Sequence, residues 1–144
     1  MSRGFTLVEL VVVLAVAGVA AGVAVPAFGR LLDAVPAPSA PVAELLDRAR
    51  RTAVERAVPV TVTVLPVSRR YWVWAETGAG RAQVADGVLA LPEGARLATS
   101  GPRIHVRFTP SGPATGDTVA VWTAAGVERV TVDSWTGAVR VAAQ

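Results

Sequence analysis

The pattern of apolar and polar positions separates an apolar stretch near the start of the chain from a mixed remainder. From Leu10 to Phe28 the sequence has no charged side chain, and Glu9 and Arg30 are the charges that flank this stretch. As a helix that rises about 1.5 Å per residue it would be about 28 Å long, close to the ~30 Å hydrocarbon core of a bilayer. The pattern therefore predicts a helix long enough to span a membrane over residues 10–28.

A proline-rich segment follows this predicted helix. Three of the seven residues from Val35 to Pro41 are proline, and a regular helix does not continue through such a run. The residues that remain are enough for one small domain but too few for two. We therefore expect a hinge over residues 35–41 and one globular head over residues 42–144.

The head begins with an amphipathic pattern that predicts a helix from Val42 to Val58. Apolar side chains recur there at helical spacing, and Glu44 and Arg48 have the four-residue separation that favours an ion pair. The arginines of this helix are Arg48, Arg50, Arg51 and Arg56. They are consistent with a phosphate-binding stripe or with a solvated face, and the acidic residues between them favour the solvated face.

Beyond Pro59 the apolar positions alternate, which predicts short strands separated by glycine and proline turns. The first two strands, Val60 to Val64 and Arg70 to Ala75, are expected to form a hairpin. Later strand candidates are Gly87 to Leu91, Ala95 to Ala98, Arg103 to Thr109, Asp117 to Thr123, Glu128 to Asp133 and Ala138 to Ala142. The sequence thus predicts an α+β fold, in which the amphipathic helix packs on one face of a small antiparallel sheet.

Composition restricts the chemistry that this head can perform. The chain has no cysteine, which excludes disulfides and thiolate metal sites, and all 14 basic residues are arginine. The formal net charge of +3 over 144 residues gives little electrostatic attraction for nucleic acid. With 52% hydrophobic residues the chain also differs from a disordered protein.

Candidate catalytic and metal-binding residues are few. His105 lies on an alternating strand and shares its face with Arg103 and Arg107, so we interpret it as a solvent-facing histidine. The chain has neither a Gly-x-Ser-x-Gly nucleophile motif nor a phosphate-binding loop with lysine. The acids considered for calcium are Asp86, Asp117 and Asp133, and their spacing is not that of a calcium loop. We therefore expect no enzyme activity, no cofactor and no bound metal.

Four tryptophans are the remaining conspicuous side chains. Trp72 and Trp74 fall on one face of the same expected strand, and we predict that they pack under the helix as core. A partner-binding patch is the alternative, because exposed aromatic side chains are efficient contact anchors. For Trp122 and Trp135 the sequence does not decide between core and partner-binding patch.

The start of the chain resembles a known processing signal. Gly4-Phe-Thr-Leu-Val-Glu-Leu10, followed by an apolar run, is similar to the class III signal of type IV pilins and type II secretion pseudopilins. The resemblance implies that a prepilin peptidase removes residues 1–4 as a leader, by cutting between Gly4 and Phe5, and then methylates the new amino terminus at Phe5. It also implies a pilin-like spike over residues 5–34.

Glu9 stands at the start of the predicted membrane helix. An ionised carboxylate in hydrocarbon costs several kcal/mol unless it is paired or protonated, so a partner is expected. The resemblance implies that this partner is the positive amino terminus of a neighbouring subunit, which makes Glu9 an assembly residue. The alternative is an interfacial acid that the helix dipole favours.

The head resembles the GspH/FimT-like branch of minor pseudopilins. Its expected helix carries Ala49-Arg-Arg-Thr-Ala53, which matches an Ala-Arg-x-x-Ala pattern, and Phe108-Thr-Pro-Ser-Gly112 matches Phe-x-Pro-x-Gly. The resemblance implies a structural subunit of a type II secretion pseudopilus or a type IV pilus. Its partners would be other pilin-like subunits, the prepilin peptidase and an exported protein. The subunit would cross the inner membrane once, with its amino terminus cytoplasmic and its head periplasmic, and Arg3 agrees with this orientation.

One branch of the family suggests an alternative function. FimT-like proteins implicated in DNA uptake tend to end in a Gly-Arg-x-Arg element that contacts DNA, whereas this chain has Gly137-Ala-Val-Arg140. One of the two arginines is absent. Arg140 is therefore the weak DNA contact of the alternative, a DNA-binding minor pilin of a natural-transformation pilus.

Overall fold

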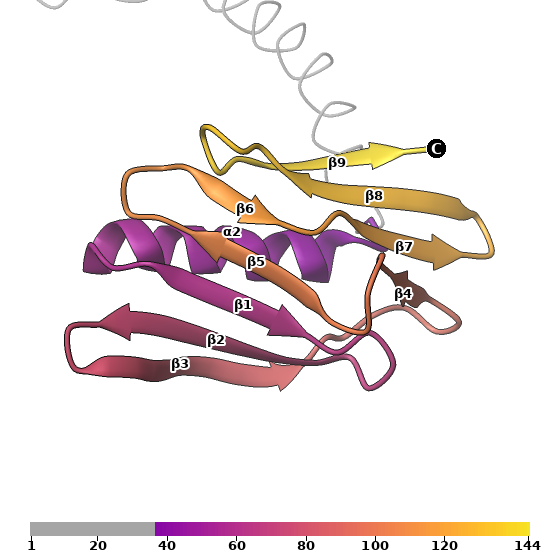
Figure 1. Cartoon of the computed structure of the whole chain (residues 1–144). Helices are drawn as coiled ribbons and strands as arrows, with labels where there is room; N and C mark the ends of the chain where they lie inside the picture. The colour runs from indigo at the N-terminus through magenta and orange to yellow at the C-terminus, as the bar shows by residue number, and fades with distance from the viewer. Residues whose placement is uncertain (1–36) are drawn as a thin grey trace, which may run out of the picture. The chain divides into compact units, whose positions relative to one another are not determined.

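A computed structural model describes residues 37–144, and Ala37–Gln144 form a compact unit of their own. The predicted leader, membrane helix and assembly residue, with Gly4, Phe5 and Glu9, lie outside the described residues. The described part holds one helix, α2, and nine strands, β1 to β9 (Figure 1). Within it, no helix combines the length and the apolar character that a membrane crossing requires.

Helix α2 runs from Ala40 to Arg56, which is two residues earlier at each end than the sequence predicts. It begins earlier because Pro41 occupies the first turn, where a missing backbone N–H costs nothing. It ends at Ala57, whose left-handed backbone (φ 52°) turns the chain toward Pro59 and the first strand. The backbone N–H of Ser39 donates to Glu128 Oε2 at 2.9 Å, which attaches the start of the helix to a distant strand.

Five strands form the first sheet, in the order β3-β2-β1-β5-β6, and each pair is antiparallel. These strands are β1 Val60–Val64, β2 Arg70–Thr77, β3 Gly80–Val88, β5 Ile104–Phe108 and β6 Ala114–Gly116. Strand β1 lies at the centre, paired with β2 on one side and with β5 on the other. The predicted first hairpin, β1 with β2, is confirmed.

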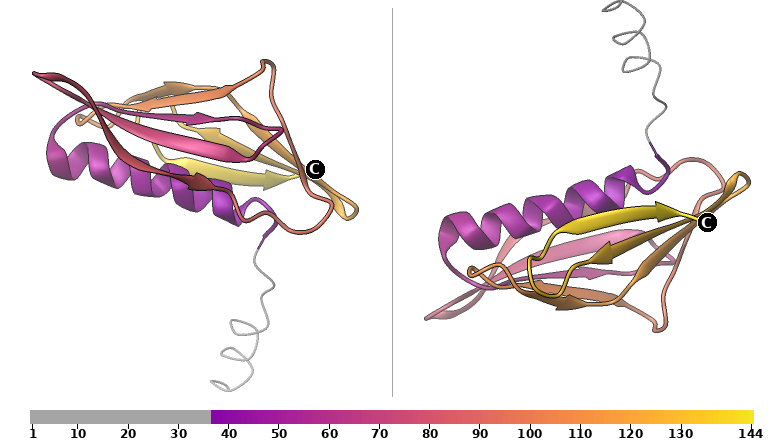
Figure 2. Two further views of the ribbon diagram at one scale, coloured as in Figure 1. Left: turned by 90° about the horizontal axis from the view of Figure 1, so that it is seen from below. Right: turned by 90° about the horizontal axis from the view of Figure 1, so that it is seen from above.

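Four strands form the second sheet, in the order β4-β7-β8-β9, again with antiparallel pairs. These strands are β4 Arg96–Ala98, β7 Val119–Thr123, β8 Gly126–Val132 and β9 Val139–Ala143. Helix α2 contacts β1 and β5 of the first sheet and β9 of the second. Figure 2 shows the helix lying along one side of both sheets, so that one helix covers two sheets where the sequence suggested one.

A single hydrophobic core joins these elements. The apolar stripe of α2, with Leu46 and Ala53, packs on alternate residues of the strands, and Phe108 is completely buried. On β1, Val60, Val62 and Val64 point into the core, while the threonines between them point to the opposite face. That opposite face, turned away from α2, is called the outer face of the first sheet below.

One strand is absent from the sequence prediction, and another overlaps it only at residues 87–88, where the expected strand Gly87 to Leu91 begins. Residues 80–86 belong to β3, although only the last part of that strand was expected, and β6 was missed entirely. Strand β3 is an edge strand with mostly exposed side chains and an irregular register opposite Val73 and Trp74, so it shows no apolar alternation. Strand β6 has only the three residues Ala114–Gly116, which is too short for a period to be visible.

The prediction that Trp72 and Trp74 form part of the core is wrong. On β2 the fully buried side chains are Val73 and Ala75, and both tryptophans are half-buried on the outer face. Trp74 is paired in register with Thr61 of β1, which has the same orientation. The smaller residues of this strand are buried in the core, and the indoles lie on the face that the helix does not cover.

Candidate functional surface

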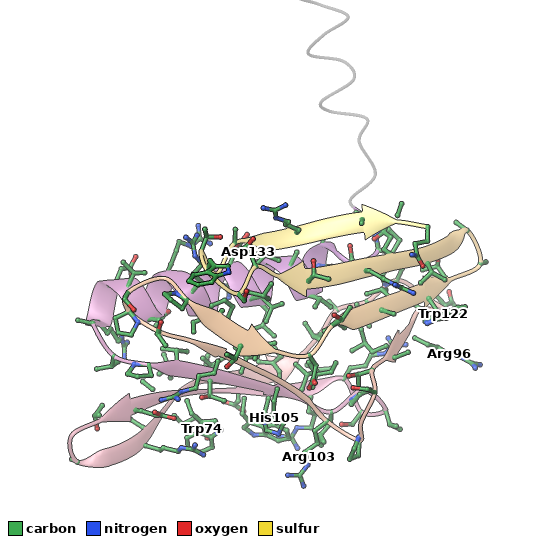
Figure 3. The ribbon with its side chains drawn as sticks, turned by 45° about the horizontal axis from the view of Figure 1, so that its top comes forward. Trp74, Arg96, Arg103, His105, Trp122 and Asp133 are labelled. Carbon is green, nitrogen blue, oxygen red and sulfur yellow. The ribbon has the colours of Figure 1, made fainter. Side chains whose placement is uncertain are left out.

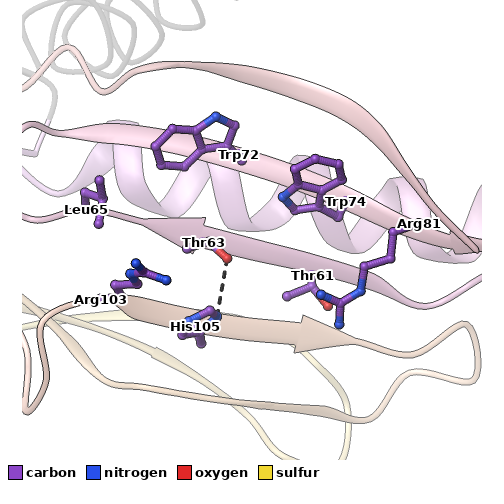
Figure 4. Close-up of a pocket in the computed structure, with 8 residues that line it drawn as sticks. All are labelled: Thr61, Thr63, Leu65, Trp72, Trp74, Arg81, Arg103 and His105. Atoms are coloured by element: carbon purple, nitrogen blue, oxygen red, sulfur yellow. Dashed lines mark hydrogen bonds between the residues drawn. The ribbon is translucent and has the colours of Figure 1, made fainter.

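The outer face of the first sheet carries a pocket of about 420 Å³ that runs along strand β1 (Figure 4). We call this pocket the outer trough; its lining residues are Thr61, Thr63, Leu65, Trp72, Trp74, Arg81, Arg103 and His105. The strand registers explain its form: β1 supplies a floor of short threonine side chains, while β2 and β5 supply larger side chains on the two sides. Figure 4 shows α2 behind the strands, with the lining side chains on the near side.

The two indoles form one side of the outer trough. The guanidinium carbon of Arg70 lies 5.4 Å from the centroid of the Trp72 ring, within the range of a cation–π contact. Opposite Trp72, beyond Thr63, lies His105, whose Nδ1 is 3.3 Å from Thr63 Oγ1. His105 is exposed and shares its face with Arg103 and Arg107, as the sequence predicted.

Charged side chains surround the outer trough. Glu76 accepts hydrogen bonds from Arg107 at 2.6 Å and from Arg81 at 3.5 Å. The backbone N–H of His105 donates to Asp117 Oδ2 at 2.9 Å. These groups are ion-paired or hydrogen-bonded to one another on an exposed sheet face.

The three acidic residues Asp86, Asp117 and Asp133 do not come together as a calcium site. Asp86 lies on β3, Asp117 precedes β7, and Asp133 lies in the turn between β8 and β9. Within residues 37–144, no group of three histidine or acidic side chains is arranged to hold a metal ion.

Asp133 organises the turn that leads to the last strand. Its Oδ1 accepts hydrogen bonds from the backbone N–H groups of Thr136 at 2.9 Å and Trp135 at 3.0 Å, and its Oδ2 lies 3.4 Å from the guanidinium of Arg140. The backbone and side-chain hydrogen bonds from Thr136, then the N–H of Trp135 and the charge of Arg140, lower the pKa of the Asp133 carboxyl. Arg140, the candidate DNA contact on β9, is therefore paired with an acid of the preceding turn.

The two tryptophans that the sequence left open are both exposed. Trp135 is 84% exposed at the β8–β9 turn, and Trp122 is 52% exposed on β7, paired in register with Arg96 of β4. Figure 3 shows Trp74, Arg103 and His105 on the first sheet, whereas Trp122 and Arg96 lie on the second. Trp122 is thus a separate aromatic position, away from the outer trough.

Two family models match the chain. The model of the prokaryotic N-terminal methylation motif matches residues 1–25, and the model of the type II transport protein GspH matches residues 42–137. The chain belongs to the GspH family. No match is found among curated protein sequences.

Solved structures show the same pilin-like fold in the head. The minor pseudopilin EpsH from the type 2 secretion system of Vibrio cholerae is 19% identical, with a TM-score of 0.55 over 71% of this chain and 90% of that one. The type IV minor pilin FimU of Pseudomonas aeruginosa is 16% identical in two crystal forms. In one crystal form the TM-score is 0.53, over 74% of this chain and 90% of FimU. In the other it is 0.56, over 74% of this chain and 85% of FimU.

Membership of the GspH family places the chain among the minor pseudopilins and pilins of type II secretion or type IV pili. These are structural families, so the chain is not an enzyme. The family also implies assembly with other pilin-like subunits.

The motifs of this GspH-family head meet beside the C-terminal half of α2. A Cβ placed on Gly137 would contact the carbonyl oxygen of Gly112 and would lie 3.3 Å from Arg50 Nε. Arg50 belongs to the Ala-Arg-x-x-Ala segment, whose alanines Ala49 and Ala53 are buried against the sheets. Arg50, Gly112 and Gly137 therefore mark a close junction of helix, loop and turn, and we assign this junction to packing of the fold.

The outer trough is the feature that sequence reasoning missed as a whole. The sequence allows a partner-binding patch at Trp72 and Trp74 and predicts the correct face for His105, but no pattern in it connects the two strands. The connecting signal is present in the alternation of β1, because Thr61 and Thr63 lie on the face opposite three buried valines. The neighbours of that face are set by the pairing of β1 with both β2 and β5, which only the structure reveals.

Proposed function

We propose that this chain is a minor pseudopilin of a type II secretion pseudopilus, a structural subunit for protein export that is anchored in the inner membrane by its N-terminal helix. The observation that carries the proposal is the joint presence of the methylation motif at residues 1–25 and the GspH match at residues 42–137 in one chain. The amino terminus would face the cytoplasm and the head the periplasm. The head would contact neighbouring minor subunits or an exported protein.

Maturation in this proposal requires a prepilin peptidase, which cuts between Gly4 and Phe5 and methylates Phe5. Coexpression with a prepilin peptidase, followed by mass spectrometry of the intact protein, tests this step. The expected product lacks residues 1–4 and carries one methyl group on Phe5. A Gly4→Val variant, altered at the cleavage position, is expected to keep its leader. Recovery of the wild-type chain with residues 1–4 attached would contradict the proposal.

Assembly in this proposal depends on Glu9. Its carboxylate would pair with the amino terminus of a neighbouring subunit, because an unpaired carboxylate in hydrocarbon is costly. We expect Glu9→Ala to be cleaved normally but to be absent from filaments, whereas Glu9→Asp, which keeps the charge, retains part of the incorporation. Filament fractions probed for the head would show this. Normal assembly of Glu9→Ala would refute the pairing role.

A DNA-binding minor pilin of a natural-transformation pilus is the alternative, and the likeness to the FimU fold keeps the pilus branch open. Its contact residue would be Arg140, which is already paired with Asp133. Nonspecific DNA affinity increases with the number of phosphates that a protein neutralises, so one paired arginine contributes little. A mobility-shift assay with micromolar head fragment distinguishes the two functions. Salt-sensitive retardation that is lost in Arg140→Gln would favour the alternative.

A further inference from the structure

The outer trough combines two aromatic faces, hydroxyl groups and an arginine that makes no ion pair among residues 37–144. We propose that it is a carbohydrate-binding site, which takes a short oligosaccharide with an acidic group at one end. The sugar rings would lie against Trp72 and Trp74, their hydroxyls would reach the threonines of β1, and the acidic group would meet Arg103. This inference goes beyond the proposed function and does not depend on whether the chain serves secretion or a pilus.

The two indoles give the outer trough a flat apolar side. Trp72 and Trp74 are two positions apart on β2, so they share a face and are about 7 Å apart along the strand. Both are half-buried, and Figure 4 shows their rings beside the open floor of the trough. A pyranose ring is apolar on its C–H faces and polar at its hydroxyl edges. It would therefore cover an indole with one face while its edges reach hydroxyl and guanidinium groups.

The hydrogen-bonding groups of the outer trough favour a sugar over a peptide. Strand β1, which forms the floor, is paired with β2 and β5 on its two sides, so its backbone groups are already used. An extended peptide laid on this floor would find no strand edge to pair with, and its own N–H and C=O groups would remain unsatisfied. Recognition must come from side chains, which suits a ligand whose polar groups are hydroxyls.

Thr61 adds a polar group without a partner to the floor of the trough, and other such groups elsewhere in residues 37–144 are Ser39 Oγ, Arg50 Nε and Thr99 Oγ1. The Oγ1 of Thr61 is buried and has no hydrogen-bond partner among the described residues, although it lines the trough. A buried hydroxyl without a partner is costly, and a valine at the same position would avoid this cost. A sugar hydroxyl can both donate to and accept from Thr61 Oγ1.

The charges of the outer face disfavour a polyanion such as a nucleic acid strand. This face carries Arg70, Arg81, Arg103 and Arg107 together with Glu76, Asp86 and Asp117. The three carboxylates offset most of the charge of the four arginines, so this face gives little net attraction for a chain with a phosphate at every nucleotide. Arg81 is shared with Glu76, whereas Arg103 has no hydrogen-bonded or ionic partner within residues 37–144. Of the two arginines that line the trough, Arg103 is thus the one without an acidic partner among residues 37–144, and it matches one acidic substituent.

The test uses the full-length protein in a zwitterionic detergent without sugar groups. Isothermal titration would be run with a panel of acidic and neutral oligosaccharides, covering α- and β-linked hexoses, N-acetylhexosamines and uronic acids. An oligothymidylate and an oligoglutamate peptide of similar length complete the panel. We expect at least one acidic oligosaccharide to bind more tightly than its neutral counterpart. Binding of no oligosaccharide, or preferential binding of thymidylate or peptide, overturns the proposal.

Variants then locate the bound sugar. Trp74→Ala is expected to weaken oligosaccharide binding by at least about tenfold, because it removes an aromatic anchor. Trp122→Ala removes an exposed tryptophan of the second sheet and should leave binding unchanged. Arg103→Gln should reduce the affinity for the acidic oligosaccharide to that for the neutral one. Unchanged binding by Trp74→Ala, or equal losses in Trp74→Ala and Trp122→Ala, would overturn the assignment to this trough.

Thr61→Val separates a binding role from a structural one. The substitution removes the unpartnered hydroxyl and keeps the side-chain shape, so the thermal midpoint of the free protein should rise or stay the same. Oligosaccharide affinity should fall in the same variant. A variant that is destabilised, or that binds as tightly as the wild type, would contradict the proposed contact.

Discussion

The positions of Trp72 and Trp74 show how neighbouring residues decide which side of a strand is buried. Val73 and Ala75 alternate with them and are both almost completely buried. Since alternate residues of a strand point to opposite faces, burial of the smaller pair places the indoles on the outer face. The bulk of a tryptophan indicates a preference for burial, but the choice between two faces is made by all the strands of a sheet together.

The lowered pKa of Asp133 predicts that its contribution to stability depends on pH. Its pKa is lowered in the folded protein from the ordinary value of 3.8, chiefly by the hydrogen bonds from Thr136. The stabilisation is therefore complete above that ordinary value and is lost as the pH falls through the lowered one. Asp133→Asn should reduce the thermal midpoint most near neutral pH, and the difference from wild type should shrink on acidification.

Thermal unfolding of wild type and Asp133→Asn at a series of pH values measures this effect. Asp47→Asn is the matched control, because it removes the same charge from an exposed position on α2. A difference between wild type and Asp133→Asn that stays constant down to the most acidic pH would contradict the assigned hydrogen bonds.

Among the elements, β3 shows that the apolar pattern of one segment does not always predict a strand. Its sequence is polar and glycine-containing, and most of its side chains are exposed. It is a strand because β2 offers a complete partner, with pairs from Arg70 opposite Val88 to Thr77 opposite Gly80. Its place in the fold therefore depends on pairing with a neighbour, which its own apolar pattern does not reveal.

A second prediction concerns Gly137, in the turn between β8 and β9, and its effect on stability. Gly137 has a left-handed backbone (φ 66°), and a Cβ there would meet the carbonyl oxygen of Gly112. Gly137→Ala should lower the free energy of unfolding by about 1–3 kcal/mol, because it adds backbone strain and separates the turn from its neighbouring loop. Urea unfolding of the head would measure this loss.

Gly94→Ala is the matched control for this substitution. Gly94 lies in the turn between β3 and β4 with a left-handed backbone (φ 75°), and a Cβ there would have no atom within 4 Å. Its loss of stability should be about 1 kcal/mol, from backbone strain alone, and smaller than the loss in Gly137→Ala. Equal losses in the two alanine variants would show that backbone strain, and not the junction with Gly112, is responsible.

For the whole molecule, residues 37–144 form one compact unit whose core draws on α2 and both sheets. We therefore predict that a chain starting at Ala37 folds in the absence of detergent and unfolds cooperatively. Circular dichroism during thermal unfolding would test this, with Leu46→Asp as a variant that should abolish the transition by placing a charge in the core. A broad, non-cooperative transition of the unsubstituted fragment would contradict the prediction.

Patterns of apolar residues within short segments of the sequence predicted most of the helix and strands of this head. Helical spacing from Val42 onward identified α2 to within two residues at each end, and alternation identified β1 and most later strands. The motif at Gly4 to Leu10 and the pattern around Phe108 indicated the family, which the family models confirm. These features were accessible because each depends on residues that are close together in the chain. The cleavage at Gly4 and the pairing of Glu9 stay predictions.

The tertiary structure alone decided which strands are neighbours. It divided the strands into two sheets, placed β1 between β2 and β5, and so brought Trp72, His105 and Arg103 around the threonines of β1. No periodicity within a segment specifies these pairings, because they join residues far apart in sequence and depend on how all the apolar faces are buried together. The sequence by itself thus determined the elements and the family, and packing determined which side chains share a surface.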